Sequence, residues 1–197
     1  MSDETLLYIH GFLSSPQSYK AQKTKEWLAE CHPEIRFVAP ELSPYPFDVR
    51  DTLTQIVEGL VGRVYLMGSS LGGFWSTYLA ERYDLPAVLI NPACEPHKLL
   101  PRYVGQTVQN YHSERSYHLS QQHVDELAEI GSAPMTKPEN YWLMVQTGDE
   151  TLDYRLAVAK YAGARQLVEE GGNHGFEHFE RHLPATVSFY REFFQKG

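Results

Sequence analysis

The chain has 197 residues, of which 42% are hydrophobic and 21% charged, as expected of one globular domain with a sizeable core. Its formal net charge is −8. Because nucleic acids and anionic membrane surfaces repel an acidic protein, neither is an expected partner.

Short apolar runs alternate with segments of helical periodicity along most of the chain. The expected strands cover residues 6–10, 35–39, 63–67, 87–90, 141–147 and 165–169. The expected helices cover residues 18–30, 48–60, 74–82, 153–161 and 176–194. Asp48 is the expected cap of the second helix, and the last is interrupted near Pro184. This alternation predicts an α/β fold: a parallel sheet of about six strands in the order 2-1-3-4-5-6, flanked by helices.

Residues 93–140 break the alternation after the fourth strand, and are called the insertion below. They contain one helical stretch at about 118–129. Because sites in parallel sheets gather at the carboxyl ends of strands, we expect a small cap over a site, within a single domain spanning 1–197. Its apolar side chains line an acyl pocket or form the insertion's own core: Leu99, Leu100, Tyr103, Tyr111 and Tyr117.

The third strand runs into a glycine-flanked turn, Gly68-Ser-Ser-Leu-Gly72, followed by a helical segment. The pattern G-x-S-x-G needs both glycines because the turn leaves no room for side chains. Ser70 meets this condition, whereas Ser69 is flanked by Met67 and Leu71. The N–H of Leu71 then points to where an oxyanion would form. The alternative interpretation is an ordinary glycine-rich turn between a strand and a helix.

A serine hydroxyl needs an adjacent base to act as a nucleophile near neutral pH. Among the nine histidines, only His10 and His174 closely follow a core strand. His174 lies in a glycine-rich loop after the sixth strand and is the expected base. His174, His178 and His182 also share the spacing i, i+4, i+8. No carboxylate or thiolate completes a metal site with them, so no metal is expected.

The loop after the fifth strand offers three carboxylates that could orient the histidine: Asp149, Glu150 and Asp153. Asp149 lies just beyond the strand and is the favoured acid, whereas Asp153 suits the N-cap of the next helix. Ser70, Asp149 and His174 thus follow three different strands, in the chain order expected of an α/β-hydrolase.

A second oxyanion donor is expected from the loop after the first strand, His10-Gly-Phe12. Gly11 lets the backbone approach the serine, Phe12 donates its N–H, and His10 supports the loop through a hydrogen bond. A simple exit from the strand is the alternative for His10 and Gly11. The chain has no G-x-G-x-x-G after the first strand and no G-x-x-x-x-G-K, so no nucleotide cofactor is expected.

Short stretches that resemble one known protein family are spread over nearly the whole chain. These stretches are residues 7–12, 68–73, 91–93, 146–154 and 170–174. Together they resemble the small bacterial esterases of the YqiA/YcfP type, within the α/β-hydrolase superfamily. The resemblance implies hydrolysis of carboxylic esters or thioesters, with Ser70, Asp149 and His174 as the catalytic triad. The chain departs from the wider superfamily in the acid loop, because Thr151 stands three residues after Gly148, where the acid is usual.

We therefore expect a serine hydrolase that cleaves esters or thioesters of short to medium acyl chains through an acyl-enzyme, without a cofactor. The alternatives are a binding protein that keeps the hydrolase fold without activity, and an amide or lactone hydrolase. Lys98, Arg102 and Arg115 suit the anionic part of an acyl-CoA thioester or are solvated surface. The expected partner is the small-molecule substrate, and the chain is expected to be a monomer or weak homodimer.

The two cysteines, Cys31 and Cys94, form no C-x-x-C pair, so two free thiols and a reducing compartment are expected. The first residues have neither the basic nor the apolar region of a signal peptide. No apolar run approaches the roughly 20 residues of a membrane span. These features predict a cytoplasmic protein.

Overall fold

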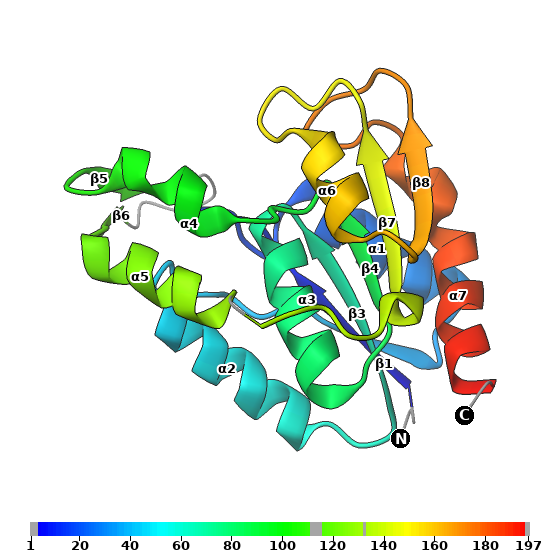
Figure 1. Cartoon of the computed structure of the whole chain (residues 1–197). Helices are drawn as coiled ribbons and strands as arrows, with labels where there is room; N and C mark the ends of the chain where they lie inside the picture. The colour runs from blue at the N-terminus through cyan, green and yellow to red at the C-terminus, as the bar shows by residue number, and fades with distance from the viewer. Residues whose placement is uncertain (1–3, 111–115, 132, 196–197) are drawn as a thin grey trace.

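The computed structural model describes residues 4–110, 116–131 and 133–195, and its centre is a six-stranded parallel sheet (Figure 1). The strands of this sheet are β1 (Glu4–Ile9), β2 (Ile35–Val38), β3 (Arg63–Ser69), β4 (Ala87–Ile90), β7 (Tyr141–Gln146) and β8 (Arg165–Glu169). They lie in the order β2-β1-β3-β4-β7-β8. Because β5 and β6 belong to a separate hairpin, this is the predicted order 2-1-3-4-5-6, and the predicted α/β fold is confirmed.

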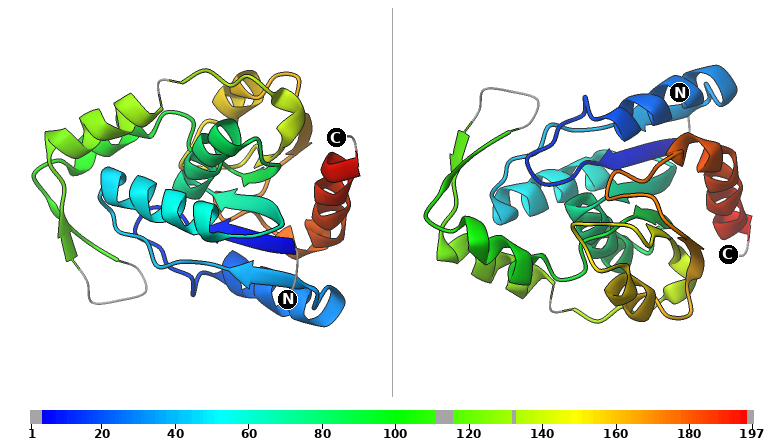
Figure 2. Two further views of the ribbon diagram at one scale, coloured as in Figure 1. Left: turned by 90° about the horizontal axis from the view of Figure 1, so that it is seen from below. Right: turned by 90° about the horizontal axis from the view of Figure 1, so that it is seen from above.

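Helices cover both faces of the sheet, as the views from below and from above show (Figure 2). The helices on the sheet are α1 (Tyr19–Cys31), α2 (Pro46–Gly59), α3 (Leu71–Tyr83), α6 (Tyr154–Lys160) and α7 (Leu183–Gln195). The α1 and α7 helices pack against one face, and α2, α3 and α6 against the other. In β1, Leu6 and Tyr8 point to the first layer, and Leu7 and Ile9 to the second. Burial on both faces explains why the central strands are continuous apolar runs rather than alternating ones.

The carboxyl ends of the central strands are aligned. Gly68 of β3 pairs with Ile9 of β1, and Ser69 pairs with Ile90 of β4. Ile90 in turn pairs with Met144 of β7. The loops after these strands therefore begin at one edge of the sheet, which is the condition for residues far apart in sequence to meet.

The α7 helix reaches into the sheet through a buried tyrosine. The Tyr190 hydroxyl donates a hydrogen bond of 2.7 Å to the backbone carbonyl of Leu66, in the middle of β3. The Tyr190 ring also stacks on that of Tyr65, with 4.8 Å between the centroids. Burial raises the pKa of Tyr190 well above its ordinary value, so the hydroxyl stays protonated and donates this bond.

The predicted starts of α2 and α3 are wrong. The predicted cap Asp48 lies inside the first turn of α2, because the helix starts at Pro46 after the N-cap Tyr45. Proline suits the first helical position, where a backbone N–H would have no partner. The α3 helix starts at Leu71 rather than at residue 74, directly after the turn that contains Ser70.

The last predicted helix, 176–194, is divided. Residues Phe179–His182 form a 3₁₀ turn (η3), and α7 starts at Leu183 with Pro184 in its first turn. The predicted interruption near Pro184 is therefore the boundary between these two elements. Proline has no backbone N–H, so inside a helix it removes a hydrogen bond. In the first turn of a helix this N–H would have no partner, so proline suits the start of a new helix.

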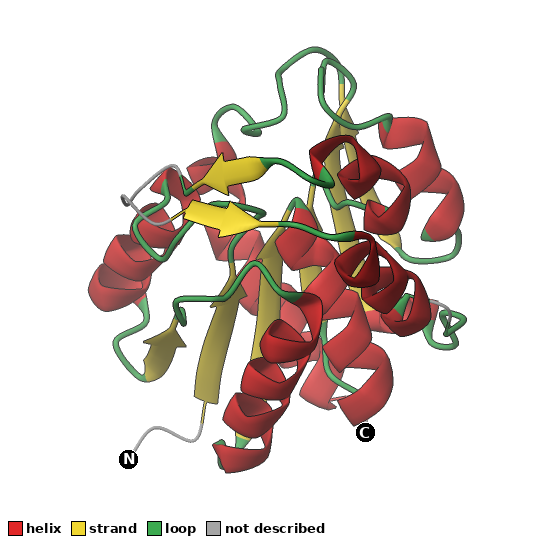
Figure 3. Cartoon of the chain, turned by 90° about the vertical axis from the view of Figure 1, so that its left-hand side faces the viewer, coloured by secondary structure: helices red, strands yellow, loops and turns green. Residues whose placement is uncertain are grey.

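The insertion leaves the sheet after β4 and returns at β7, projecting to one side of the molecule (Figures 1 and 3). Its elements are α4 (Pro96–Leu99), η1 (Leu100–Tyr103), the antiparallel strands β5 (Thr107–Gln109) and β6 (Ser116–His118), α5 (Gln121–Ile130) and η2 (Pro138–Asn140). The predicted helix 118–129 begins later than expected, because Ser120 caps α5 through a reciprocal pair of contacts with His123. Tyr111 and Arg115 lie outside the described residues.

None of the helices in the described part of the chain combines the length and the apolar character needed to cross a membrane. Both cysteines are free thiols: Cys31 is exposed and Cys94 is half-buried. Burial raises the pKa of the Cys94 thiol to about 11, so this group is a poor nucleophile near neutral pH.

The turn between β3 and α3 is packed backbone against backbone. A Cβ atom on Gly68 would lie 2.1 Å from the carbonyl oxygen of Gly72, and one on Gly72 would lie 1.9 Å from that of Ile9. Ser70, at the apex, has a φ of 56° and a ψ of −121°, a conformation that non-glycine residues rarely adopt. These contacts fix the start of α3 against the ends of β1 and β3.

Replacing Gly72 by alanine should therefore lower the free energy of unfolding by about 3 kcal/mol or more, because backbone atoms cannot yield as a side chain can. Gly59→Ala is the matched control. A Cβ on Gly59 meets nothing within 4 Å, so this change should stabilise α2 by about 0.5–1 kcal/mol. Urea unfolding curves of the two variants measure the difference, and equal stabilities would contradict the close packing of the turn.

Candidate active site

The imidazole of His174 lies between the hydroxyl of Ser70 and the carboxylate of Asp149. The His174 Nε2 atom is 3.0 Å from Ser70 Oγ, and Nδ1 is 2.8 Å from Asp149 Oδ2. When Nδ1–H donates to the carboxylate, Nε2 carries a lone pair directed at the hydroxyl and can accept its proton. The structure thus brings together three side chains from the loops after β3, β7 and β8, which the sequence predicted as one group.

The carboxylate of Asp149 is held from both sides. Its side chain is only 1% exposed, and Oδ1 accepts hydrogen bonds from the backbone N–H groups of Thr151 (2.9 Å) and Leu152 (2.8 Å). These bonds leave Oδ2 facing the histidine. The loop therefore fixes the orientation of the Asp149 carboxylate.

The two other candidate acids have different tasks. Glu150 accepts the backbone N–H of His174 at 3.0 Å, and this bond lowers the pKa of the Glu150 carboxyl. Asp153 is the N-cap of α6, accepts the N–H of Arg155, and pairs with its guanidinium. Asp153 thus occupies the capping position that its place in the sequence suggested.

Two backbone N–H groups close to Ser70 are free to donate a hydrogen bond. Within the described residues, the N–H groups of Phe12 and Leu71 donate to no acceptor. Leu71 is the first residue of α3, where helix geometry leaves the N–H free. The absence of a side chain on Gly11 lets the loop between β1 and α1 approach the serine, because a Cβ on Gly11 would lie 3.3 Å from Ser70 Cβ. The His10 imidazole is 2.9 Å from the Gly11 carbonyl oxygen, the loop contact expected of it.

The histidine loop is anchored by an asparagine of the neighbouring strand. Asn91, directly after β4, donates from its amide to the carbonyls of Asn173 (3.0 Å) and His174 (3.1 Å). Its Oδ1 accepts the N–H of Gln146 at 3.0 Å. Asn91 is 2% exposed and has a φ of 40°, a left-handed conformation that asparagine tolerates better than most residues.

A buried glutamine completes this anchor. Gln146, the last residue of β7, accepts the backbone N–H groups of Asn173 (3.2 Å) and Glu177 (2.8 Å) through Oε1. Its Nε2 donates to the Glu177 carbonyl and to the Glu169 carboxylate, both at 3.0 Å. All the hydrogen-bonding atoms of the amide are occupied, so directional bonds hold the loop around His174 together with the apolar packing of Phe176.

A pocket of about 400 Å³ opens beside Ser70 and His174. The insertion supplies Leu99, Leu100 and Tyr103 to its wall, and α1 and η1 supply the cationic side chains of Lys20 and Arg102. The volume is in the range of small-molecule sites.

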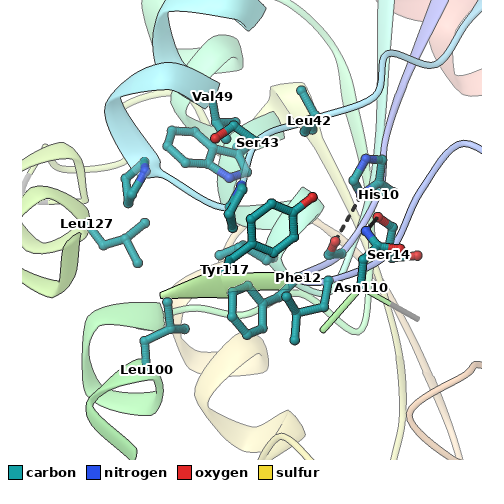
Figure 4. A pocket seen from close by; sticks show the side chains of 16 residues that line it. His10, Phe12, Ser14, Leu42, Ser43, Val49, Leu100, Asn110, Tyr117 and Leu127 are labelled. Carbon is teal, nitrogen blue, oxygen red and sulfur yellow. Dashed lines mark hydrogen bonds between the residues drawn. The ribbon is translucent and has the colours of Figure 1, made fainter. Parts of the chain in front are cut away.

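A second, much smaller cavity lies beside the loop between β1 and α1 (Figure 4). It has a volume of about 20 Å³ and is lined by Phe12, Leu100 and Tyr117, among others. Tyr117 also packs edge-on against Tyr45 at the start of α2. Of the predicted acyl-pocket residues, Leu99, Leu100 and Tyr103 therefore line the pocket at Ser70. Tyr117 packs on the α2 side of the molecule, and Tyr111 lies outside the described residues.

The three basic residues that the sequence offered for an anionic substrate group do not lie together at the pocket. Arg102 lines the pocket, whereas Lys98 is paired with Glu95. Arg115 lies outside the described residues.

The histidine series 174, 178 and 182 does not converge on one point. His182 pairs with Glu169 and packs edge-on against Phe176, so its expected place on a solvated helix side is wrong; His178 is exposed. Within the described residues, no group of three or more histidine, cysteine, aspartate or glutamate side chains is arranged to hold a metal ion.

The fold, the turn at Ser70 and the comparisons with known proteins define the class: the chain has the α/β-hydrolase fold. The model of the Uncharacterised protein family (UPF0227) matches residues 5–191, and the chain belongs to this family. The predicted membership of the YqiA/YcfP-type family is confirmed.

Several solved structures share the fold at low sequence identity. Est1E from Butyrivibrio proteoclasticus matches with a TM-score of 0.68 and 16% identity over 98% of this chain and 87% of its own; a further structure of Est1E holds ferulic acid. Mouse alpha/beta hydrolase domain-containing protein 10 gives 0.73 and 16%, over 98% and 90% of the two chains. The monoacylglycerol lipase of Paleococcus ferrophilus gives 0.67 and 16%, over 95% of each.

Sequence reasoning missed Asn91, Gln146 and Lys20. Asn91 directly follows a core strand and Gln146 ends one, and an amide at the end of an apolar run is a signal that could have been followed. Their partners lie 23 to 83 positions away along the chain, so the contacts themselves could not be foreseen. Lys20 is an ordinary residue of an amphipathic helix in the sequence, and only the fold brings it to the pocket.

Replacing Asn91 by glycine should loosen the histidine loop, since it removes three hydrogen bonds while glycine tolerates the positive φ. We expect amide hydrogen exchange over residues 171–177 to accelerate by at least about tenfold. The matched control is Asn140→Gly, another buried asparagine, which bonds Asp84 instead. If both variants, or neither, accelerate exchange over 171–177, Asn91 is not the anchor.

Proposed function

We propose that the protein is a serine hydrolase that cleaves carboxylic esters or thioesters, with Ser70 as nucleophile, His174 as base and Asp149 as orienting acid. The observation that carries this proposal is the hydrogen-bonded series in which His174 Nε2 lies 3.0 Å from Ser70 Oγ and Nδ1 lies 2.8 Å from Asp149. The same relation of nucleophile, base and acid recurs on unrelated folds that perform acyl transfer.

The reaction begins when Ser70 Oγ attacks the carbonyl carbon of the substrate and His174 Nε2 takes the hydroxyl proton. The carbonyl oxygen gains negative charge, and the N–H groups of Phe12 and Leu71 stabilise it. His174 then donates the proton to the leaving alcohol or thiol, and an acyl-enzyme remains. Water, activated by His174, attacks this acyl-enzyme and releases the acid and the free Ser70.

Asp149 fixes the tautomer of His174. Its carboxylate requires a proton on Nδ1, which leaves Nε2 unprotonated for the first step. When the imidazolium forms, the buried carboxylate stabilises its positive charge, and the bonds from Thr151 and Leu152 keep the acid in place.

The proposed substrates have short to medium acyl chains. The supporting observations are the pocket volume of about 400 Å³ and the apolar side chains Leu99, Leu100 and Tyr103 beside Ser70. The solved structures that share the fold include the monoacylglycerol lipase of Paleococcus ferrophilus and the esterase domain of a Rhodothermus marinus protein. A panel of 4-nitrophenyl esters, thioesters, amides and lactones of matched acyl length separates these bond classes.

Ser70→Ala should abolish ester hydrolysis and labelling by a fluorophosphonate probe without unfolding the protein. Alanine keeps the Cβ of serine, so the strain at the positive φ changes little. Turnover of 4-nitrophenyl butyrate and gel fluorescence after labelling provide the measurements, and circular dichroism provides the folding control. Undiminished turnover in the variant would assign the nucleophile elsewhere; a wild-type protein that neither turns over nor labels would be a binding protein with a hydrolase fold.

Asp149→Asn should lower kcat by about a thousandfold, because an asparagine amide no longer favours the proton on Nδ1 of His174. Asp153→Asn is the matched control in the same loop. Asparagine caps helices as well as aspartate, so this change should alter kcat by less than about twofold. The reverse ranking in steady-state kinetics would move the acid to Asp153.

A further inference from the structure

The pocket at Ser70 is lined by two positively charged side chains. Lys20 comes from α1 and Arg102 from η1 of the insertion, so the charges stand on separate elements of the wall. Hydrolysis of an ester bond by Ser70, His174 and Asp149 uses neither of them. Their presence requires a separate explanation.

Lys20 is partly buried and held in position. Its Nζ donates a hydrogen bond of 2.8 Å to the carbonyl of Gly175, next to His174. Burial lowers the pKa of Lys20 to about 8, and the carboxylate of Asp149 raises it in part. At pH 7 the ammonium group is therefore still mostly charged, with further donor positions besides the one that Gly175 uses.

Arg102 stands at the exposed side of the pocket. Its guanidinium lies over the ring of Tyr103, 4.9 Å from the centroid, which orients the group beside another lining residue. A guanidinium held on an aromatic ring keeps its N–H groups available for a carboxylate or phosphate.

Neither cation forms an ion pair with a described carboxylate, although the chain has 25 acidic and 17 basic residues and the buried Asp149 acts on Lys20 without pairing with it. Within the described part of the chain, Lys20 and Arg102 form no ion pair, whereas Lys98 pairs with Glu95 and Arg191 with Glu34. The described residues that line the pocket include no aspartate or glutamate. In a protein of net charge −8, the pocket is thus a local region of positive charge.

We propose that the substrate carries a second, negatively charged oxygen group in addition to the bond that is cleaved, and that Lys20 and Arg102 bind it. This inference rests on the proposed function, and it narrows the substrates to anionic esters or thioesters. The charged group anchors the substrate while the apolar side chains Leu99 and Leu100 contact its carbon chain. Lys20 and Arg102 are then specificity-determining residues and take no part in the chemical step.

Two matched pairs of esters test the proposal at pH 7. The first pair, mono-4-nitrophenyl adipate and its methyl-capped diester, differs by a carboxylate on the acyl side. The second pair, 4-butyryloxybenzoic acid and its methyl ester, differs by a carboxylate on the alcohol side. For each pair, the measured quantity is the ratio of kcat/KM for the charged ester to that for the neutral one, corrected for spontaneous hydrolysis.

Lys20→Met and Arg102→Met should each lower this ratio by about tenfold in at least one pair, because a charge-assisted hydrogen bond is lost. Lys20→Arg keeps the charge and should retain the wild-type ratio. The controls Lys25→Met, on the exposed side of α1, and Lys98→Met, on α4, remove the same charge outside the pocket. Both controls should leave the ratios unchanged, which separates local binding from general attraction by the whole protein.

The outcomes separate the two proposals. If Lys20→Met and Arg102→Met lower both rates of each pair alike, their roles are structural and the anion site is wrong, while the hydrolase proposal stands. A ratio that falls equally in the two control variants also overturns the anion site. If wild-type protein hydrolyses none of the four esters in a Ser70-dependent manner, the proposed function fails and the inference fails with it.

Discussion

The backbone contact between Gly72 and Ile9 determines where the candidate nucleophile stands. With no side chain on Gly72, α3 starts directly against the end of β1, so the turn before it has room for one arrangement. Ser70 is then fixed at both ends: its N–H donates to Ile90, and its carbonyl accepts from Ala93. A residue with an unfavourable φ persists because its surroundings over-determine it. The strain at Ser70 is maintained by the neighbouring strands β1 and β4 together with the contacts of its own turn.

The same logic holds for the histidine loop. Its position depends on Asn91, which follows β4, and on Gln146, which ends β7, as well as on β8, from which it emerges. The order of the strands therefore does more than bring three loops to one edge. Each loop is hydrogen-bonded to the strand beside it, so Ser70, Asp149 and His174 are positioned relative to one another by the sheet itself. Apolar packing alone would leave such loops free to shift by more than hydrogen bonding allows.

The sequence allowed the fold and the meeting of the three side chains to be predicted because both depend on local signals. Alternating apolar runs define the strands, and the glycines around Ser70 define the turn. The hairpin β5–β6 was missed because strands of three residues carry too little periodicity to be recognised. The start of α2 was misplaced because Asp48 is a common capping residue, whereas Pro46 decides the position through the backbone. Lys20 could not be assigned to the pocket, since its neighbour Gly175 is 155 positions away.

The hydrogen bond from Tyr190 to Leu66 has a consequence for biosynthesis. The middle of β3, which leads into Ser70, receives this buried donor from α7, the last helix of the described residues. During translation, residues 183–195 leave the ribosome long after β3 has been made. Until then, the face of the sheet that α1 also covers lacks the apolar side chains of α7, including Val187 and Phe189. The apolar cover of this face is therefore completed only when α7 packs beside α1.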